Sequence, residues 1–200
     1  FCQQGHLLDP ASVEGAPLDA SLWDTLDTTG ARSMAFAGGN PDESLYAILQ
    51  FLATAPADWM LPIVWNCHGA ATLETVSLLD GVVDAFVPDF KYGSDQCGRR
   101  LSGISDYPAT AQAAITEMLA QRVPVIVRVL VLPGHRICCH LPVLQRLASL
   151  RGTCLISVRG QYCPDYRITS ADGTLARRPT WDEVEVVRAT ARQLGLVVIE

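Results

Sequence analysis

Apolar runs rich in β-branched residues alternate along this chain with segments whose apolar residues recur at helical spacing. Six runs predict buried strands, at residues 33–37, 61–66, 83–88, 125–131, 154–158 and 196–199. Six segments predict helices, at about residues 20–27, 42–54, 71–79, 109–121, 142–150 and 181–194. Near-continuous apolar strands that alternate with helices are typical of a parallel sheet covered by helices. The pattern therefore predicts an α/β fold, either an open doubly wound sheet or a full or partial (β/α) barrel.

Local signals mark the ends of several predicted helices. Pro41 stands just before the helix at 42–54, where its fixed backbone suits the first turn. Thr180, followed three residues later by Glu183, is a capping-box pattern for the last helix. Gly81 and Gly195 stand where a predicted helix ends and a strand follows.

Composition narrows the class of protein. With 200 residues, 49% of them hydrophobic and 18% charged, the chain can bury one sizeable core, so we expect a single domain over residues 1–200. The net charge of -6 and the lack of any run of Lys and Arg argue against nucleic acid or an anionic membrane as partner. The longest apolar run, 123–132, contains Pro124 and Arg128 and is about half the roughly 20 residues that a membrane-spanning helix needs.

The cysteines and the first residues bear on the cellular compartment. Seven cysteines form an odd set without regular spacing, which argues against a secreted disulfide framework and favours the reducing cytoplasm: Cys2, Cys67, Cys97, Cys138, Cys139, Cys154 and Cys163. The chain begins Phe1-Cys2-Gln3-Gln4, without Met or a signal-like segment, so we expect that residues precede it. Cys138-Cys139-His140 suggests a metal site, but adjacent side chains diverge and no second ligand pair has zinc-like spacing. We therefore interpret these three as packing residues.

Residues that bind or react in parallel β/α folds collect where strands end and the following loops begin. The unusual residues of this chain fall at those points: Gly38-Gly39-Asn40-Pro41, Asn66-Cys67-His68-Gly69, Asp89-Phe90-Lys91, Pro133-Gly134-His135 and Gly160-Gln161-Tyr162. Arg128 lies within the predicted strand at 125–131, where a guanidinium requires a carboxylate-like partner from the protein or from a ligand. The glycine motif is either a simple turn or a place of close ligand approach. Asp89 and Lys91 are compatible with a local surface ion pair.

The order of these motifs resembles a known family. Phe1-Cys2-Gln3-Gln4 resembles the end of the radical S-adenosylmethionine (SAM) signature C-x3-C-x2-C. The glycine motif, the D-F-K and L-P-G strand ends and the G-Q-Y turn follow in the order seen in proteins similar to pyruvate formate-lyase activating enzyme. The resemblance extends from Phe1 to about Leu196, and it is specific because the whole series is in order.

The resemblance implies both a fold and an activity. The fold would be a partial (β/α)6, TIM-like barrel of parallel strands whose first strand and cluster loop largely precede this chain. Such enzymes hold a [4Fe-4S] cluster on three thiolates and bind SAM at its open iron site. Reductive cleavage of SAM then yields a 5'-deoxyadenosyl radical that abstracts a hydrogen atom from the substrate. An activase-like oxidoreductase of this kind implies a glycyl-radical enzyme or another protein or peptide as substrate, and a flavodoxin or ferredoxin as electron donor.

The resemblance also implies roles for individual residues. Cys2 would be the third cluster thiolate and Phe1 would lie beside the adenine. The other implied cofactor-binding residues are Gly38, Gly39, Asn40 and Pro41 as a GGEP-type motif, Asn66, Asp89, Lys91, Arg128 and Gln161. Among these, Arg128 would pair with the methionyl carboxylate and Lys91 would lie close to SAM. Asn40 stands where an acidic residue is commoner, and Cys67-His68 are inserted before Gly69.

The main departure from the family pattern is at the N-terminal end: two of the three cluster cysteines are not in this sequence. We therefore expect the chain by itself to be inactive, since Cys67 and Cys163 are poor replacements for thiolates grouped on one loop. An alternative is a non-catalytic barrel remnant that binds a partner or a SAM-like ligand. A further alternative is a metal-free barrel lyase that uses Lys91 as a Schiff-base nucleophile.

Overall fold

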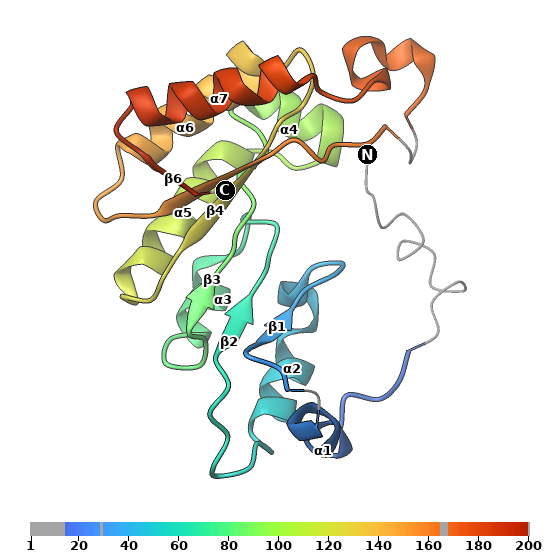
Figure 1. Ribbon diagram of the computed structural model, residues 1–200, viewed down its shortest axis with the longest axis vertical. Coiled ribbons are helices and arrows are strands. Elements are labelled where there is room, and N and C mark those ends of the chain that lie inside the picture. The colour runs from blue at the N-terminus through green and yellow to red at the C-terminus, as the bar shows by residue number, and fades with distance from the viewer. Residues whose placement is uncertain (1–14, 29, 165–167, 200) are drawn as a thin grey trace.

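The computed structural model describes residues 15–28, 30–164 and 168–199, and it contains every strand and helix that the hydrophobic pattern predicts (Figure 1). The strands are β1 (Met34–Phe36), β2 (Ile63–Trp65), β3 (Ala85–Phe86), β4 (Ile126–Leu130), β5 (Leu155–Arg159) and β6 (Val197–Ile199). The corresponding helices are α1 (Ser21–Thr28), α2 (Leu45–Leu52), α3 (Leu73–Leu78), α5 (Tyr107–Ala120), α6 (Leu141–Ala148) and α7 (Trp181–Gln193). A 3-10 turn, η3 (Pro41–Ser44), leads into α2.

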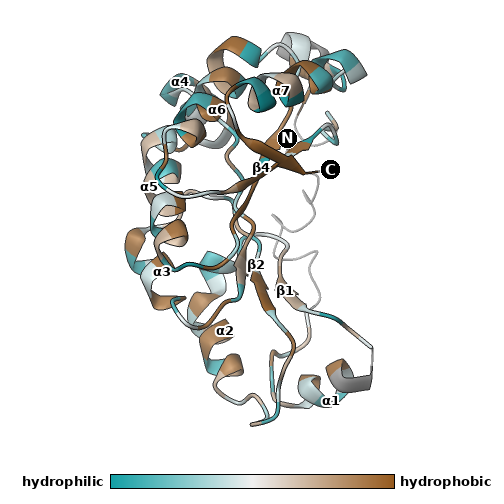
Figure 2. Cartoon of the chain, turned by 60° about the vertical axis from the view of Figure 1, so that its left-hand side comes forward, coloured by the Kyte–Doolittle hydropathy of each residue, from teal (hydrophilic) through white to brown (hydrophobic). Residues whose placement is uncertain are grey.

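All strand pairs are parallel, in two three-stranded sheets of order β1-β2-β3 and β4-β5-β6. Two isolated bridges, Phe86 with Val125 and Asp89 with Arg128, join the sheets between β3 and β4. The strands therefore follow one another in chain order along an arc, and the helices cover its outer side (Figure 2). Among the described residues β1 and β6 pair on one side only, so the result is an α/β fold consistent with a partial barrel rather than a closed one.

The main hydrophobic core lies between the strands and the helices that cover them. In β4 the side chains of Val127 and Val129 are fully buried, whereas those of Ile126, Arg128 and Leu130 are half-buried. Successive side chains of a strand point to opposite faces, so Arg128 lies on the inner face of the arc and not among the core side chains. This alternation explains how a guanidinium is accommodated in so apolar a strand.

Three helical segments of the structure were not predicted from the sequence: α4 (Asp95–Ser102), a π-helical turn η4 (Arg136–His140) and a 3-10 segment η5 (Ser170–Ala176). Helix α4 has only eight residues and is mostly polar, so its one apolar pair, Cys97 and Leu101, is too short a pattern to identify a helix. Its start is fixed by the side chain of Ser94, whose Oγ accepts the backbone N–H of Cys97 at 3.3 Å. No helix in the described part of the chain combines the length and the apolar character needed to cross a bilayer.

The predicted capping box at the start of α7 is present and predicts a pH-dependent contribution to stability. Thr180 and Glu183 exchange hydrogen bonds of 2.8 and 3.2 Å, and Arg177 donates two more to the Glu183 carboxylate. The hydrogen bond from Arg177 is the main reason that the pKa of Glu183 falls from 4.5 to about 2. Because the folded pKa is depressed, the stabilisation is present above pH 4.5 and is lost as the pH falls toward 2.

We therefore expect Glu183→Gln to lower the free energy of unfolding at neutral pH, by no more than about 1 kcal/mol because the ion pair is largely exposed to solvent. The difference between variant and wild type should shrink at about pH 3, where the wild-type carboxyl begins to bind its proton. Urea unfolding at the two pH values measures it. A difference that stays constant with pH would show that Glu183 acts only through its shape.

Candidate functional site

A cavity of about 350 Å³ lies where the strands end and the following loops begin. Seven of the residues predicted to bind a cofactor line it: Gly38, Gly39, Asn66, Asp89, Lys91, Arg128 and Gln161. They come from five strand ends and are brought together because parallel strands present their carboxyl ends at the same edge. The structure adds lining residues that were given no cofactor-binding role from the sequence: Ala37, Cys67, His68, Leu130, Arg159 and Tyr162.

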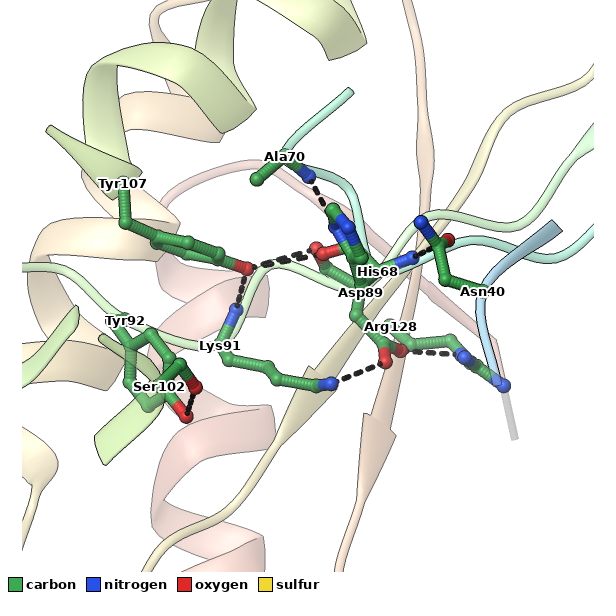
Figure 3. Close-up of polar contacts among 9 residues, drawn as sticks. All are labelled: Asn40, His68, Ala70, Asp89, Lys91, Tyr92, Ser102, Tyr107 and Arg128. Atoms are coloured by element: carbon green, nitrogen blue, oxygen red, sulfur yellow. Dashed lines mark hydrogen bonds and ion pairs between the residues drawn. The ribbon is translucent and has the colours of Figure 1, made fainter. Parts of the chain in front are cut away.

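The remaining predicted residues do not line the cavity. Asn40 is buried, and its side-chain oxygen accepts the backbone N–H of His68 at 3.3 Å (Figure 3). It therefore holds the loop after β2 against the loop after β1. Pro41 is buried in the first turn of η3. Phe1 and Cys2 lie outside the described residues.

Asp89 is the centre of the charged network in the cavity. One of its carboxylate oxygens lies 2.6 Å from Arg128 Nε and the other lies 3.1 Å from Lys91 Nζ (Figure 3). The parallel bridge between Asp89 and Arg128 sets this geometry, because it places both residues at the same level of the arc. The carboxylate partner that the sequence required for Arg128 thus comes from the protein. Of the Arg128 guanidinium, Asp89 binds only Nε. The two Nη groups of Arg128 can therefore still donate hydrogen bonds to a ligand.

The charge of the cavity is opposite to that of the whole chain. Lys91, Arg128 and Arg159 line it with one carboxylate, Asp89, which leaves positive charge in excess, whereas the chain carries a net charge of -6. Concave surfaces lined by one sign of charge concentrate ligands of the other sign. The cavity is therefore suited to a ligand that carries a carboxylate or a similar anionic group.

One polar atom of the wall is available to a ligand. The side-chain oxygen of Asn66 is buried and has no hydrogen-bond partner among the described residues. A buried acceptor without a partner costs free energy, so a ligand that donates a hydrogen bond there would gain from it. Beside Gly39, a Cβ would meet no atom of the described residues within 4 Å.

Tyr107 holds the loops behind the cavity together. This residue of α5 is fully buried. Its hydroxyl accepts a hydrogen bond from the Lys91 backbone N–H at 2.9 Å (Figure 3). The same hydroxyl lies 3.2 Å from the carbonyl oxygen of Asp89 and 3.3 Å from that of His68. Burial raises the pKa of Tyr107 well above its ordinary value, so the hydroxyl keeps its proton and can donate to one of these carbonyls.

We expect Tyr107→Phe to lower the free energy of unfolding by about 1 to 3 kcal/mol, because it leaves the buried N–H of Lys91 without its acceptor. Urea unfolding measures the loss. Tyr46→Phe is a matched control, since the Tyr46 side chain is exposed and should cost little. Equal stability of the two variants would contradict the role given to the Tyr107 hydroxyl.

The described cysteines near the cavity do not form a three-thiolate set. Cys67 lines the wall, but burial raises the pKa of its thiol to about 12, so it stays protonated. Cys163 is half-buried, does not line the cavity and accepts a hydrogen bond from Arg178 Nη2 at 2.9 Å. The described residues thus fit the carboxylate of a SAM-type ligand, whereas they do not fit a [4Fe-4S] cluster.

A second group of candidate ligands lies between α4 and η4. The ligand atoms of Cys97, His135 and Cys138 all lie within 4.8 Å of one another. Of the Cys138-Cys139-His140 motif, only Cys138 belongs to this group. Cys139 is fully buried, and the buried His140 ring accepts the Leu132 backbone N–H at 3.0 Å, with its pKa lowered to about 4 by burial. Cys138 lies instead with Cys97 and His135, which no sequence motif links to it.

Comparisons with known proteins support the fold. No family model matches the chain. An uncharacterized protein of Methanocaldococcus jannaschii is 32% identical over 169 residues, which are 84% of this chain and 48% of that protein. The chain thus spans about half the length of this relative. The crystal structure of a domain of pyruvate-formate lyase-activating enzyme from Bacteroides vulgatus is similar with a TM-score of 0.66 and 14% identity, over 84% of this chain and 98% of that domain. At this identity the likeness shows a shared fold.

Proposed function

We propose that this chain is the barrel portion of a radical SAM enzyme and that its cavity holds S-adenosylmethionine. The observation that carries the proposal is the positively charged cavity at the strand ends, in which Asp89 orients Arg128 and Lys91. The fold shared with a domain of an activating enzyme and the ordered motifs support the same assignment.

The side chains of the cavity have distinct parts in this proposal. The Nη groups of Arg128 donate to the methionyl carboxylate, since a guanidinium matches a carboxylate with two parallel hydrogen bonds. The backbone around Gly38 and Gly39 meets the amino group. The buried oxygen of Asn66 accepts a hydrogen bond from the ligand. Asp89 does not touch the ligand but keeps Arg128 and Lys91 in place.

A cluster that accompanies SAM in such enzymes supplies reductive cleavage and hydrogen-atom abstraction. Besides Cys2, its thiolates would have to come from outside this sequence, so we assign no step of the reaction to residues of the cavity. In the full proposal the substrate is a glycyl-radical enzyme or another protein or peptide, and the electron donor is a flavodoxin or a ferredoxin.

The second candidate function is a non-catalytic barrel that binds SAM or a similar ligand. The observation that favours it is the placement of the described cysteines: Cys67 is the one that lines the cavity, and its thiol is protonated. Both candidates require the same ligand site, and they differ in whether a cluster is held beside it.

Two measurements test these candidates. Isothermal titration calorimetry of the chain with SAM should give saturable binding under either one, and a lack of binding would contradict both. Anaerobic reconstitution with iron and sulfide, on a protein that includes the residues encoded ahead of Phe1, then separates them. The enzyme should acquire broad visible absorbance that bleaches on reduction, as thiolate-bound clusters do, whereas the non-catalytic barrel should stay colourless and still bind SAM.

A further inference from the structure

Cys97, His135 and Cys138 belong to different elements and lie outside the cavity described above. Cys97 is in the first turn of α4, His135 precedes η4 and Cys138 lies within η4. Single π-helical turns such as η4 occur often at functional sites. The three ligand atoms lie within 4.8 Å of one another, and in tetrahedral zinc sites two ligands are about 3.5 to 3.8 Å apart. Small side-chain rotations therefore suffice to bring these atoms around one ion.

The His135 ring is held in the orientation that a metal ligand needs. Its Nδ1 lies 2.8 Å from the Pro133 carbonyl oxygen, which can only accept, so Nδ1 carries the proton. The lone pair is then on Nε2, where the Arg100 guanidinium donates to it at 3.1 Å. Histidines that bind metals usually donate their other N–H to a carbonyl or carboxylate in this way. Arg100 is exposed, so it can turn to solvent when an ion takes its place.

The two thiols differ in environment. Cys97 is buried in the first turn of α4. Cys138 is only half-buried, which gives an ion access to the group from solvent.

We propose that Cys97, Cys138 and His135 bind a divalent ion of the zinc class, with the fourth position open to water or to a ligand. Two sulfurs and one imidazole nitrogen with an open position form a known zinc ligand set. A disulfide between the two cysteines is the competing use of this pair, and it is an outcome of the test below. This site is independent of SAM binding and of any cluster.

Metal titration of the reduced, metal-free chain tests the proposal. Co²⁺ should bind as a single ion per chain with thiolate charge-transfer and tetrahedral bands, and Zn²⁺ should displace it. Cys97→Ser, Cys138→Ser and His135→Ala should each weaken Zn²⁺ binding by more than about 100-fold, because losing a ligand costs more than losing its hydrogen-bond partner. Cys163→Ser, a half-buried cysteine elsewhere, should bind as the wild type does.

A second measurement on the wild type avoids variants that fail to fold. Bound Zn²⁺ should slow alkylation of Cys97 and Cys138 by at least about tenfold while Cys163 reacts at an unchanged rate, as followed by peptide mass spectrometry. Alkylation of Cys97 and Cys138 at the same rate with and without Zn²⁺ would overturn the proposal. An unaltered cobalt spectrum in folded Cys97→Ser, or an isolated chain that forms a Cys97–Cys138 disulfide in place of binding the ion, would do so as well.

Discussion

Arg128→Leu should weaken the binding of S-adenosylmethionine by roughly 30-fold, which corresponds to about 2 kcal/mol. The substitution removes the guanidinium whose Nη groups we assign to the methionyl carboxylate. It also leaves Asp89 with Lys91 as its one remaining cationic partner among the described residues. Leucine is suited to the inner face of β4 because its neighbours Ile126 and Leu130 are apolar. Calorimetric titration of the folded variant measures the change.

Two further variants make the result specific to the guanidinium. Arg128→Lys keeps a positive charge near Asp89 but lacks the planar fork, so it should recover only part of the affinity. Arg151→Leu removes an exposed arginine that does not line the cavity and should leave SAM binding unchanged. Binding by Arg128→Leu that equals the wild type would contradict the proposed contact with the carboxylate.

Gly69→Ala should give the largest loss of stability of the variants considered. A Cβ at Gly69 would lie 2.0 Å from the carbonyl oxygen of Asp89, and the residue has a φ of 81°, which alanine adopts only with strain. The contact is with backbone, so no side-chain rotation relieves it. We expect a loss of at least about 4 kcal/mol, or failure to fold, because clashes of this kind stand among the largest single-residue effects.

Gly81→Ala is the matched control for this prediction. Gly81 also has a positive φ, of 71°, but a Cβ there would meet no atom within 4 Å. The substitution should therefore lower the free energy of unfolding by only about 1 to 2 kcal/mol, the cost of holding alanine in a left-handed backbone conformation. Urea unfolding of both variants measures the difference. Similar losses for the two would show that the close approach of Gly69 to Asp89 is not a strong constraint on the site.

Much of the fold and the outline of the cavity follow from the hydrophobic pattern. The six apolar runs are parallel strands because a covering helix lies between each strand and the next along the chain. The carboxyl ends of such strands meet at one edge, so Gly38, Asn66 and Lys91 could be placed together without knowledge of any side-chain position. This inference needs only the order and type of the elements.

The pairing of Asp89 with Arg128 could not be predicted in the same way. It depends on β3 and β4 being neighbours and on the register between them, and the sequence does not state either one. The buried position of Asn40 likewise depends on the path of the loop after β2, whose backbone N–H at His68 it binds.

The group of Cys97, His135 and Cys138 was missed for a related reason. Helix α4 is short and mostly polar and contains Gly98, so the single apolar pair of Cys97 and Leu101 did not reveal it. Without α4 there was no reason to bring Cys97 near a loop some 40 residues later in the chain. Contacts between elements that are distant in sequence are set by packing, and local patterns do not report them.

The most direct test of the central claim, that the cavity at the strand ends binds SAM, is an amide-resolved NMR titration of the ¹⁵N-labelled chain. Saturable shifts should concentrate at Gly38, Gly39, Asn66, Lys91 and Arg128, the residues that meet in the cavity. A titration without saturable shifts, or with shifts gathered instead at the separate pocket lined by Trp23 and Trp59, would contradict the account.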